Sequence, residues 1–305
     1  MSVRNAEILL VAVITARSTS FLFTKLLLRT MDPFNLMGIR FLIAFFILAL
    51  IFWKRMVKID RDSLFGGIKV GIVFFVVMAF EFHALRYTES MTTSFIENTA
   101  IVLVPLFEAA IAKKLPSRPV LAGSLLAIGG VGLLSFRTGS FSLGIGEVFA
   151  AGSAVTYAAA IMVTARVSKK GDSLVLGIVQ LGTIGVLGTA ASFLTESPVL
   201  PQRPIEWGFL LMLALCCSGF GFTLQPVAQR YVSSEKAGLF CAVSPVASGI
   251  LGWVFLGENL GAIGITGAVM VIASIFLEGL MEKREKERRQ NAVSASSVTG
   301  RRRFA

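Results

Sequence analysis

Charged residues are scarce in this sequence. Asp, Glu, Lys and Arg make up only 15% of its 305 residues, whereas soluble domains carry about 25%. A soluble fold of this length needs a charged surface that the chain cannot supply. Hydrophobic residues reach 55% and the mean hydropathy is +0.77, which also excludes a disordered chain. The composition therefore predicts a membrane protein that crosses the bilayer several times.

The residue types of catalytic and metal sites are scarce as well. There is one histidine, His83, and Asp occurs at only four positions. The three cysteines lie inside apolar segments without a CxxC spacing, so we interpret them as packing residues. The motifs HExxH, GxSxG, GxxxxGKS and GxxxxGKT do not occur in the sequence. We therefore expect no enzyme, no cofactor, no metal site and no ATP-driven step in this chain.

Ten apolar segments dominate the sequence. A helix needs about 20 residues to cross the hydrocarbon core of a bilayer, and each segment has or nearly has this length. Asp32-Pro33 and Gly171-Asp172-Ser173 are typical helix ends between them. The sequence predicts an all-α integral membrane protein with ten transmembrane helices. The expected helices cover residues 6–28, 34–53, 64–85, 93–112, 119–136, 143–165, 173–194, 206–229, 237–256 and 261–281.

The position of the basic residues predicts the orientation. A net charge of +11 indicates nucleic-acid binding only when basic residues gather on one soluble face, but here they fall between the apolar segments. With a cytoplasmic N-terminus, 21 of the 29 Lys and Arg residues lie on the cytoplasmic side and four lie outside. The positive-inside rule then predicts cytoplasmic termini and a multi-pass protein of the inner or plasma membrane. The basic tail, residues 282–305, is expected to be disordered.

An internal repeat relates the two halves of the sequence. Shifting the chain by 144 residues aligns Ala84–Tyr87 with Ala228–Tyr231, and five further identities follow without a gap. The shift spans five predicted helices, an odd number, so the two halves must have opposite orientations in the membrane. Residues 1–141 and 142–281 are therefore predicted to be inverted five-helix repeats, a design common in alternating-access transporters.

Short motifs stand at matching places in both halves. They are Ala84–Thr88 and Pro105 in the first half, and Ala228–Tyr231, Ser244-Pro245 and Leu256–Glu258 in the second. In their order and spacing these motifs resemble the EamA-type carriers of the drug/metabolite transporter superfamily. The resemblance implies ten helices in two repeats and a permease for a small metabolite. It also makes Lys25, Glu147 and Tyr157 family positions, whereas Lys114 and Thr15–Ser18 depart from the family pattern.

Charged groups inside the predicted helices are the main site candidates. Each costs about 2.5–3.5 kcal/mol to insert, so such groups usually face a cavity or a partner. The predicted topology places Lys25, Arg40, Glu81, His83 and Glu97 in the outer part of the membrane. They form either the outer wall of a substrate cavity or structural ion pairs, in which Lys25 or Arg40 pairs with one of the two carboxylates. His83 is either a proton sensor or a packed side chain.

The fourth predicted helix carries two carboxylates. In an uninterrupted helix Glu97 and Glu108 lie about 20° apart around the axis and about 16 Å apart along it. Such a face suits a permeation path or a proton relay, and Glu108, with fewer basic neighbours, is the preferred proton carrier. Alternatively, Glu108 pairs with Lys69. Arg17, in the polar run of the first helix, either binds an anionic group of a solute or pairs with Glu108.

We therefore expect a secondary-active transporter that exports an amino acid or another small organic solute by alternating access. Its expected partners are the solute, membrane lipids and a proton as coupling ion, with no nucleic acid; the sequence indicates no oligomeric state. A lipid-modifying membrane enzyme and a channel or scaffold are the alternatives, and the inverted repeat favours the carrier over both. The candidate cavity residues are Arg17, Lys25, Arg40, Glu81, His83, Glu97, Glu108, Tyr157, Gln180, Gln225 and Ser244.

Overall fold

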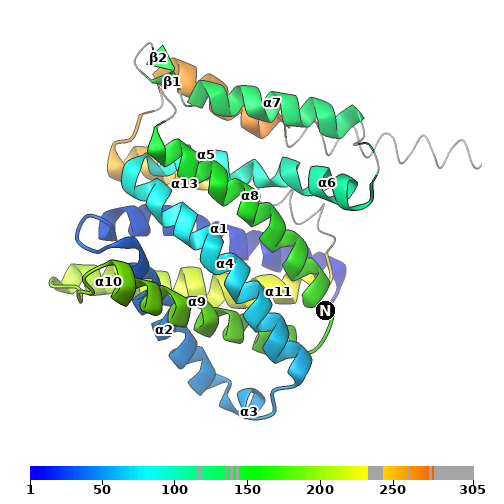
Figure 1. Cartoon of the computed structure of the whole chain (residues 1–305), viewed down its shortest axis with the longest axis vertical. Coiled ribbons are helices and arrows are strands. Elements are labelled where there is room, and N and C mark those ends of the chain that lie inside the picture. The colour runs from blue at the N-terminus through cyan, green and yellow to red at the C-terminus, as the bar shows by residue number, and fades with distance from the viewer. Residues whose placement is uncertain are drawn as a thin grey trace, which may run out of the picture.

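The computed structural model describes residues 1–113, 115, 118–134, 136–137, 140–141, 144–232, 243–259, 261–274 and 277. Some of the sequence predictions concern residues outside these ranges, namely Lys114, Cys241 and the basic tail. The described chain is built of packed helices, with α4 crossing the front of the bundle in Figure 1. Two short strands, β1 (Phe136–Arg137) and β2 (Ser140–Phe141), pair antiparallel and add a small β element to the all-α prediction.

The helices of each half follow the predicted order. Those of the first half are α1 (Val3–Leu27), α2 (Pro33–Ile51), α3 (Trp53–Met56), α4 (Arg61–Tyr87), α5 (Ser90–Asn98), α6 (Ala100–Ile111) and α7 (Arg118–Leu134). Those of the second half are α8 (Ile145–Val167), α9 (Ser173–Thr195), α10 (Pro204–Met212), the π-helical segment η1 (Leu213–Phe222), α11 (Thr223–Gln229), α13 (Val243–Leu251), the π-helical segment η2 (Gly252–Leu256) and a last helix, Gly261–Ser274.

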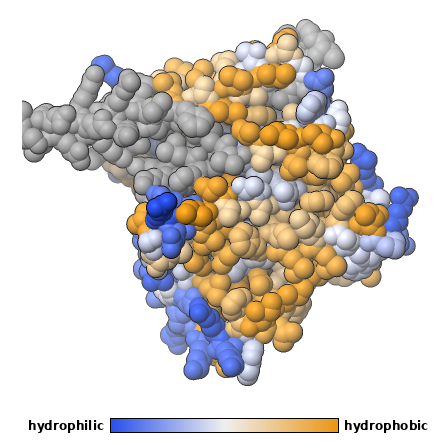
Figure 2. All heavy atoms as spheres, turned by 180° about the vertical axis from the view of Figure 1, so that it is seen from behind, coloured by the Kyte–Doolittle hydropathy of each residue, from blue (hydrophilic) through white to orange (hydrophobic). Residues whose placement is uncertain are grey.

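Seven helices of the described chain are long and apolar enough to cross a membrane. They are Val3–Leu27, Pro33–Ile51, Arg61–Tyr87, Ser90–Ile111, Ile145–Val167, Ser173–Thr195 and Pro204–Gln229, and three shorter apolar helices, Leu121–Gly130, Ser244–Leu256 and Gly261–Ser274, match the remaining predicted spans. Figure 2 shows a broad hydrophobic surface with hydrophilic residues at its two sides, the surface expected for a bilayer environment. The all-α membrane fold is confirmed, and the orientation of its termini stays a prediction.

Helix ends occur where the sequence punctuation predicts them. Pro33 is the first residue of α2, where its missing N–H leaves no hydrogen bond unmade. At the start of α9 the Asp172 carboxylate accepts a hydrogen bond of 2.9 Å from the backbone N–H of Leu174, a typical N-cap. Gly171 precedes it with a φ of 65°, which a residue with a Cβ rarely adopts.

The fourth predicted span is interrupted, although one continuous helix was expected. The chain turns at Thr99, between α5 and α6. Here the Thr99 backbone N–H bonds to the Ile96 carbonyl three residues back, and the Thr99 hydroxyl donates to the same carbonyl at 2.7 Å. Side-chain hydroxyls that bond to helix carbonyls compete with the backbone ladder and bend the helix. The predicted alignment of Glu97 and Glu108 on one helix face assumed an uninterrupted helix, and that assumption was wrong.

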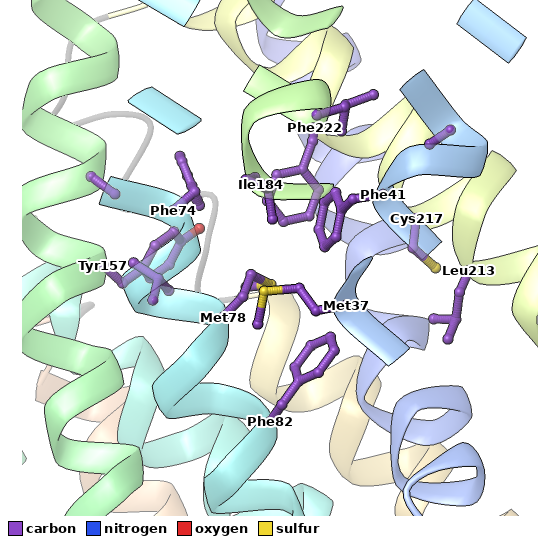
Figure 3. Close-up of a cluster of buried hydrophobic side chains, with 14 of the residues drawn as sticks. Met37, Phe41, Phe74, Met78, Phe82, Tyr157, Ile184, Leu213, Cys217 and Phe222 are labelled. Carbon is purple, nitrogen blue, oxygen red and sulfur yellow. The ribbon is translucent and has the colours of Figure 1, made fainter. Parts of the chain in front are cut away.

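The core joins helices from both halves of the sequence. Figure 3 shows Met37 and Phe41 of α2 beside Phe74 and Met78 of α4 and Phe222 of η1. The Phe222 ring makes edge contacts with two rings, at centroid distances of 5.2 Å to Phe41 and 5.3 Å to Phe74. Such contacts between large apolar side chains fix the relative position of α2, α4 and η1. Of these three, α4 and η1 contribute residues to the polar site described next.

Candidate functional site

A polar cavity lies between helices of the two halves. It contains about 20 Å³ of space open to the centre of a water molecule, which is room for about one water. Helices α1, α4 and α5 of the first half and α8, η1 and α13 of the second half contribute its lining residues. The described residues that line it are Ile14, Arg17, Ser20, Phe21, Met78, Glu81, Glu97, Asn98, Tyr157, Phe222 and Ser244.

Arg17 of α1 is the cation among the described residues that line the cavity, and its contacts come from both halves. One guanidinium nitrogen donates hydrogen bonds to the side-chain oxygen of Gln225 and, at 3.4 Å, to the hydroxyl of Tyr157. The guanidinium carbon lies 4.1 Å from the Phe222 ring centroid and 5.7 Å from that of Phe74, within cation–π range. These contacts orient the guanidinium so that it faces the cavity from α1.

Gly221 makes room for the Arg17 stem. A Cβ at this glycine would lie 2.6 Å from Cγ of Arg17, a distance that side chains do not tolerate. Gly221 belongs to η1, and π-helical segments inside α-helices are frequent at functional sites. Gly221 therefore lets α1 and η1 approach closely where Arg17 enters the cavity.

Two carboxylates share the cavity with Arg17. Glu81 of α4 and Glu97 of α5 are both 3% exposed, and both line it. Ser153 of α8 donates a hydrogen bond of 2.6 Å to Oε2 of Glu97. Within the described part of the chain, Glu81 accepts no hydrogen bond from a protein donor, so its carboxylate is left to the cavity. The site therefore combines a guanidinium, two carboxylates, a phenol and aromatic rings.

Arg40 lies behind the cavity in a cage of hydroxyl groups. It is fully buried, and it donates to Oγ of Ser218 at 2.7 Å, Oγ of Ser20 at 3.0 Å and Oγ1 of Thr24 at 3.3 Å. Among the described residues it forms no ion pair with Glu81 or Glu97, so the structural pairing considered for Arg40 is not observed. Because Ser20 also lines the cavity, Arg40 positions one of its walls.

A second polar cluster lies at one end of the bundle. Lys25 of α1 donates to the backbone carbonyls of Leu85 and Thr88, at 2.5 and 2.6 Å. The Thr88 hydroxyl donates to Oε1 of Glu147 on α8 at 2.7 Å. Next to it, the Glu258 carboxylate accepts hydrogen bonds from the backbone N–H and the hydroxyl of Ser90, at 2.8 and 2.7 Å. We call these the Thr88 contacts; they join the two halves.

The opposite end of the bundle is held by another set of polar bonds. The backbone N–H of Asp172 donates to Oγ of Ser63 at 2.7 Å, and Arg55 pairs with the Asp172 carboxylate at 3.2 Å. Ser63 also donates to the Asp60 carboxylate through its hydroxyl and its backbone N–H, and these bonds hold the pKa of Asp60 below its ordinary value. We call these the Asp172 contacts; they too join the two halves.

The structure divides the sequence candidates into groups. Arg17, Glu81, Glu97, Tyr157 and Ser244 line the cavity, and Gln225 reaches it through its bond to Arg17. Lys25 and Arg40 lie next to it. The remaining three lie elsewhere: His83 packs between the rings of Phe34 and Phe149, Gln180 is buried on α9, and Glu108 is half-buried on α6.

Sequence reasoning missed two kinds of residue at this site. Phe74 and Phe222 supply the rings around Arg17, but an aromatic residue in an apolar helix is indistinguishable from a core residue by pattern alone. Ser153, the donor to Glu97, was missed as well. Its signal was the spacing of Ser153 and Tyr157, four residues apart on α8, which places both on one helix face.

Comparisons with known proteins agree with this architecture. The EamA-like transporter family matches the chain twice, over residues 4–136 and 144–279. An uncharacterized transporter of Archaeoglobus fulgidus is 28% identical over 85% of this chain and 91% of its own length. The uncharacterized transporter YcxC of Bacillus subtilis is 26% identical over 88% and 90%. A crystal structure with 20% identity has a TM-score of 0.69, covers 93% of this chain and 99% of its own, and shows the shared fold.

Proposed function

The chain belongs to the EamA-like transporter family, and from this membership we propose that it is a secondary carrier for small organic solutes with both a carboxylate and an ammonium group, such as amino acids. The observation that carries the proposal is the cavity in which Arg17 meets Glu81 and Glu97. A guanidinium binds a carboxylate with two parallel hydrogen bonds, and a carboxylate binds an ammonium group. The rings of Phe74, Tyr157 and Phe222 offer apolar contact to the rest of the solute.

Alternating access between two repeats, residues 1–141 and 142–281, is the proposed mechanism. The two separate family matches and the contribution of both halves to the cavity support this division. A cavity with room for about one water cannot pass a metabolite, so one end must open while the other stays closed. The Thr88 contacts and the Asp172 contacts join the halves at opposite ends, and we assign the Thr88 end to the outside because of the charge distribution.

Proton antiport gives this cavity a direction. A carboxylate in the cavity is neutralised either by a proton or by the ammonium group of the solute, and it cannot hold both at once. Solute leaving on the outside is then replaced by a proton, which is released on the cytoplasmic side before the next solute binds. This competition couples export of the solute to entry of a proton down its gradient. We assign the exchange to Glu81 and Glu97, because Glu108, the residue favoured by the sequence, does not line the cavity.

The experiment is a solute screen with purified full-length protein in proteoliposomes. Amino acids, their amides and their decarboxylated amines are offered with and without a pH gradient. We expect uptake of amino acids and not of the analogues that lack the carboxylate, and we expect Arg17→Gln to remove that preference. Arg203→Gln, at an arginine outside the cavity, is the matched control. Equal transport of acids and amines, or normal selectivity in Arg17→Gln, would contradict the proposal.

A further inference from the structure

A second polar pocket lies at the Asp172 end of the bundle, away from the cavity. It has a volume of about 240 Å³ and opens between α4 and α8. Its charged rim consists of Lys69, Arg166 and Lys170, with Asp62 opposite them, and its remaining lining is Phe65, Gly66 and Val167. Three cations against one carboxylate give the rim a positive balance. None of the four charged groups forms an ion pair or hydrogen bond with another described residue.

The frame of this pocket is fixed by close packing. A Cβ at Gly66 would lie 2.5 Å from Cγ1 of Val167, so α4 and α8 pack closely beside the pocket. The Asp172 contacts tie the loop that follows α8 to the start of α4, and Arg230 donates to the Gly171 carbonyl at 2.9 Å. Lys170 therefore stands on a loop held in place from both halves. The pocket is a preformed cleft whose cations form no ion pair with another residue of the described chain.

The pocket also lies at the border between the apolar and the polar surface. Phe65, part of its lining, is an apolar ring that is 58% exposed. Lys69 stands one turn further into the span than Phe65, so its side chain reaches back toward the interface. An occupant of this pocket must therefore combine an anionic group with apolar chains.

We propose that this pocket binds the phosphate headgroup of one anionic phospholipid of the cytoplasmic leaflet. The phosphate meets Lys69, Arg166 and Lys170, and an acyl chain packs on Phe65. Basic pockets between transmembrane helices on the cytoplasmic side are suited to such headgroups, and each basic residue near the surface contributes about 1 kcal/mol. A bound lipid would brace α4 against α8 at the end of the bundle where the two halves meet. The proposal is independent of the transported solute.

The test is lipid binding to the full-length protein, measured by native mass spectrometry during titration with phosphatidylglycerol or phosphatidylcholine. We expect preferential binding of phosphatidylglycerol, weakened about fivefold by Arg166→Gln or by Lys170→Gln and about 25-fold by both. Lys169→Gln removes the neighbouring exposed cation, which does not line the pocket, and is the matched control. Asp62→Asn removes the one opposing charge and is expected to strengthen binding by a similar factor.

Three outcomes would overturn the proposal. Equal affinity for the two lipids, or equal losses in Lys169→Gln and Lys170→Gln, would mean that the surface attracts lipid without a site. Glycerol phosphate, which has the same anionic group but no acyl chains, distinguishes a lipid from a soluble phosphate. Displacement of phosphatidylglycerol by glycerol phosphate at comparable concentration would assign the pocket to a soluble anion. Because none of these measurements uses transport, failure of the proposed function leaves their outcome unchanged.

Discussion

Replacing Glu97 by Gln tests whether this carboxylate binds the solute or only packs the cavity wall. The two side chains have the same shape, and a Gln at this position still offers an oxygen to the hydroxyl of Ser153, which now donates at 2.6 Å. The helix interface between α5 and α8 is therefore retained. What disappears is one negative charge in a cavity that also contains Arg17 and Glu81.

The expected loss of affinity follows from the change of acceptor. A hydrogen bond to a charged group contributes about 1.5–3 kcal/mol and a neutral one about 0.5–1.5 kcal/mol. The difference of about 1–1.5 kcal/mol corresponds to a five- to tenfold weaker binding of the solute ammonium group. The same exchange alters the single bond to Ser153, so we expect the free energy of unfolding to change by no more than about 1.5 kcal/mol.

Counterflow in proteoliposomes measures the apparent affinity, and thermal unfolding in detergent measures the stability. Glu108→Gln is the matched control, because Glu108 lies in the same predicted span but outside the cavity lining, and its affinity should equal that of the wild type. If Glu97 exchanges protons, Glu97→Gln also loses the response to a pH gradient while counterflow continues. Wild-type affinity in Glu97→Gln, or the same loss in Glu108→Gln, would refute the reasoning.

Gly221→Ala forces a Cβ against the Arg17 stem. We therefore expect it to lower the free energy of unfolding by about 1–3 kcal/mol and to slow transport. Gly208→Ala is the control, because no atom lies within 4 Å of the added Cβ, and it should show no loss of stability in the same thermal-unfolding assay. Thr88→Val removes the donor to a buried carboxylate and should cost about 1–3 kcal/mol. Thr92→Val is its control, since that buried hydroxyl has no partner among the described residues, and equal melting temperatures of the two variants would contradict the role of the bond. Reporter fusions after residues 58 and 169 should read cytoplasmic and those after residues 32 and 200 external; two reversed reporters would contradict the predicted orientation.

The helices themselves could be predicted from the sequence because each depends on local information. Segment length and hydropathy predict a span, and Asp172 or Pro33 predicts where a helix begins, since capping needs only the first turn. The interruption at Thr99 escaped prediction for a different reason. A hydroxyl on a helix can bond to a backbone carbonyl or point to solvent, and only the surrounding packing decides between these conformations.

The cavity was harder to predict than the helices. Counting residues along the spans placed Glu81 in an outer group of charges that did not include Arg17, yet both line one cavity. The count assumes straight helices of common tilt, whereas packed helices cross one another at angles. Lys25 and Arg40 were grouped with the carboxylates by the same assumption, and the structure places them beside the cavity. The pairing of Arg17 with Gln225 joins residues 208 positions apart, which no local pattern indicates.

Gln225 binds Arg17 through a neutral amide oxygen, and this neutrality bears on the proposed binding and release of a solute carboxylate. An amide oxygen accepts the guanidinium hydrogen bond without cancelling its positive charge, so it acts as a placeholder for a stronger acceptor. A solute carboxylate that enters the cavity can take the place of the amide and replace a neutral hydrogen bond by a charge-assisted one. When the solute leaves, the amide returns to the guanidinium, so the arginine need not be left without that acceptor in a low-dielectric site. In the proposed transport cycle, the guanidinium of Arg17 therefore keeps Gln225 as a hydrogen-bond acceptor when the cavity is empty.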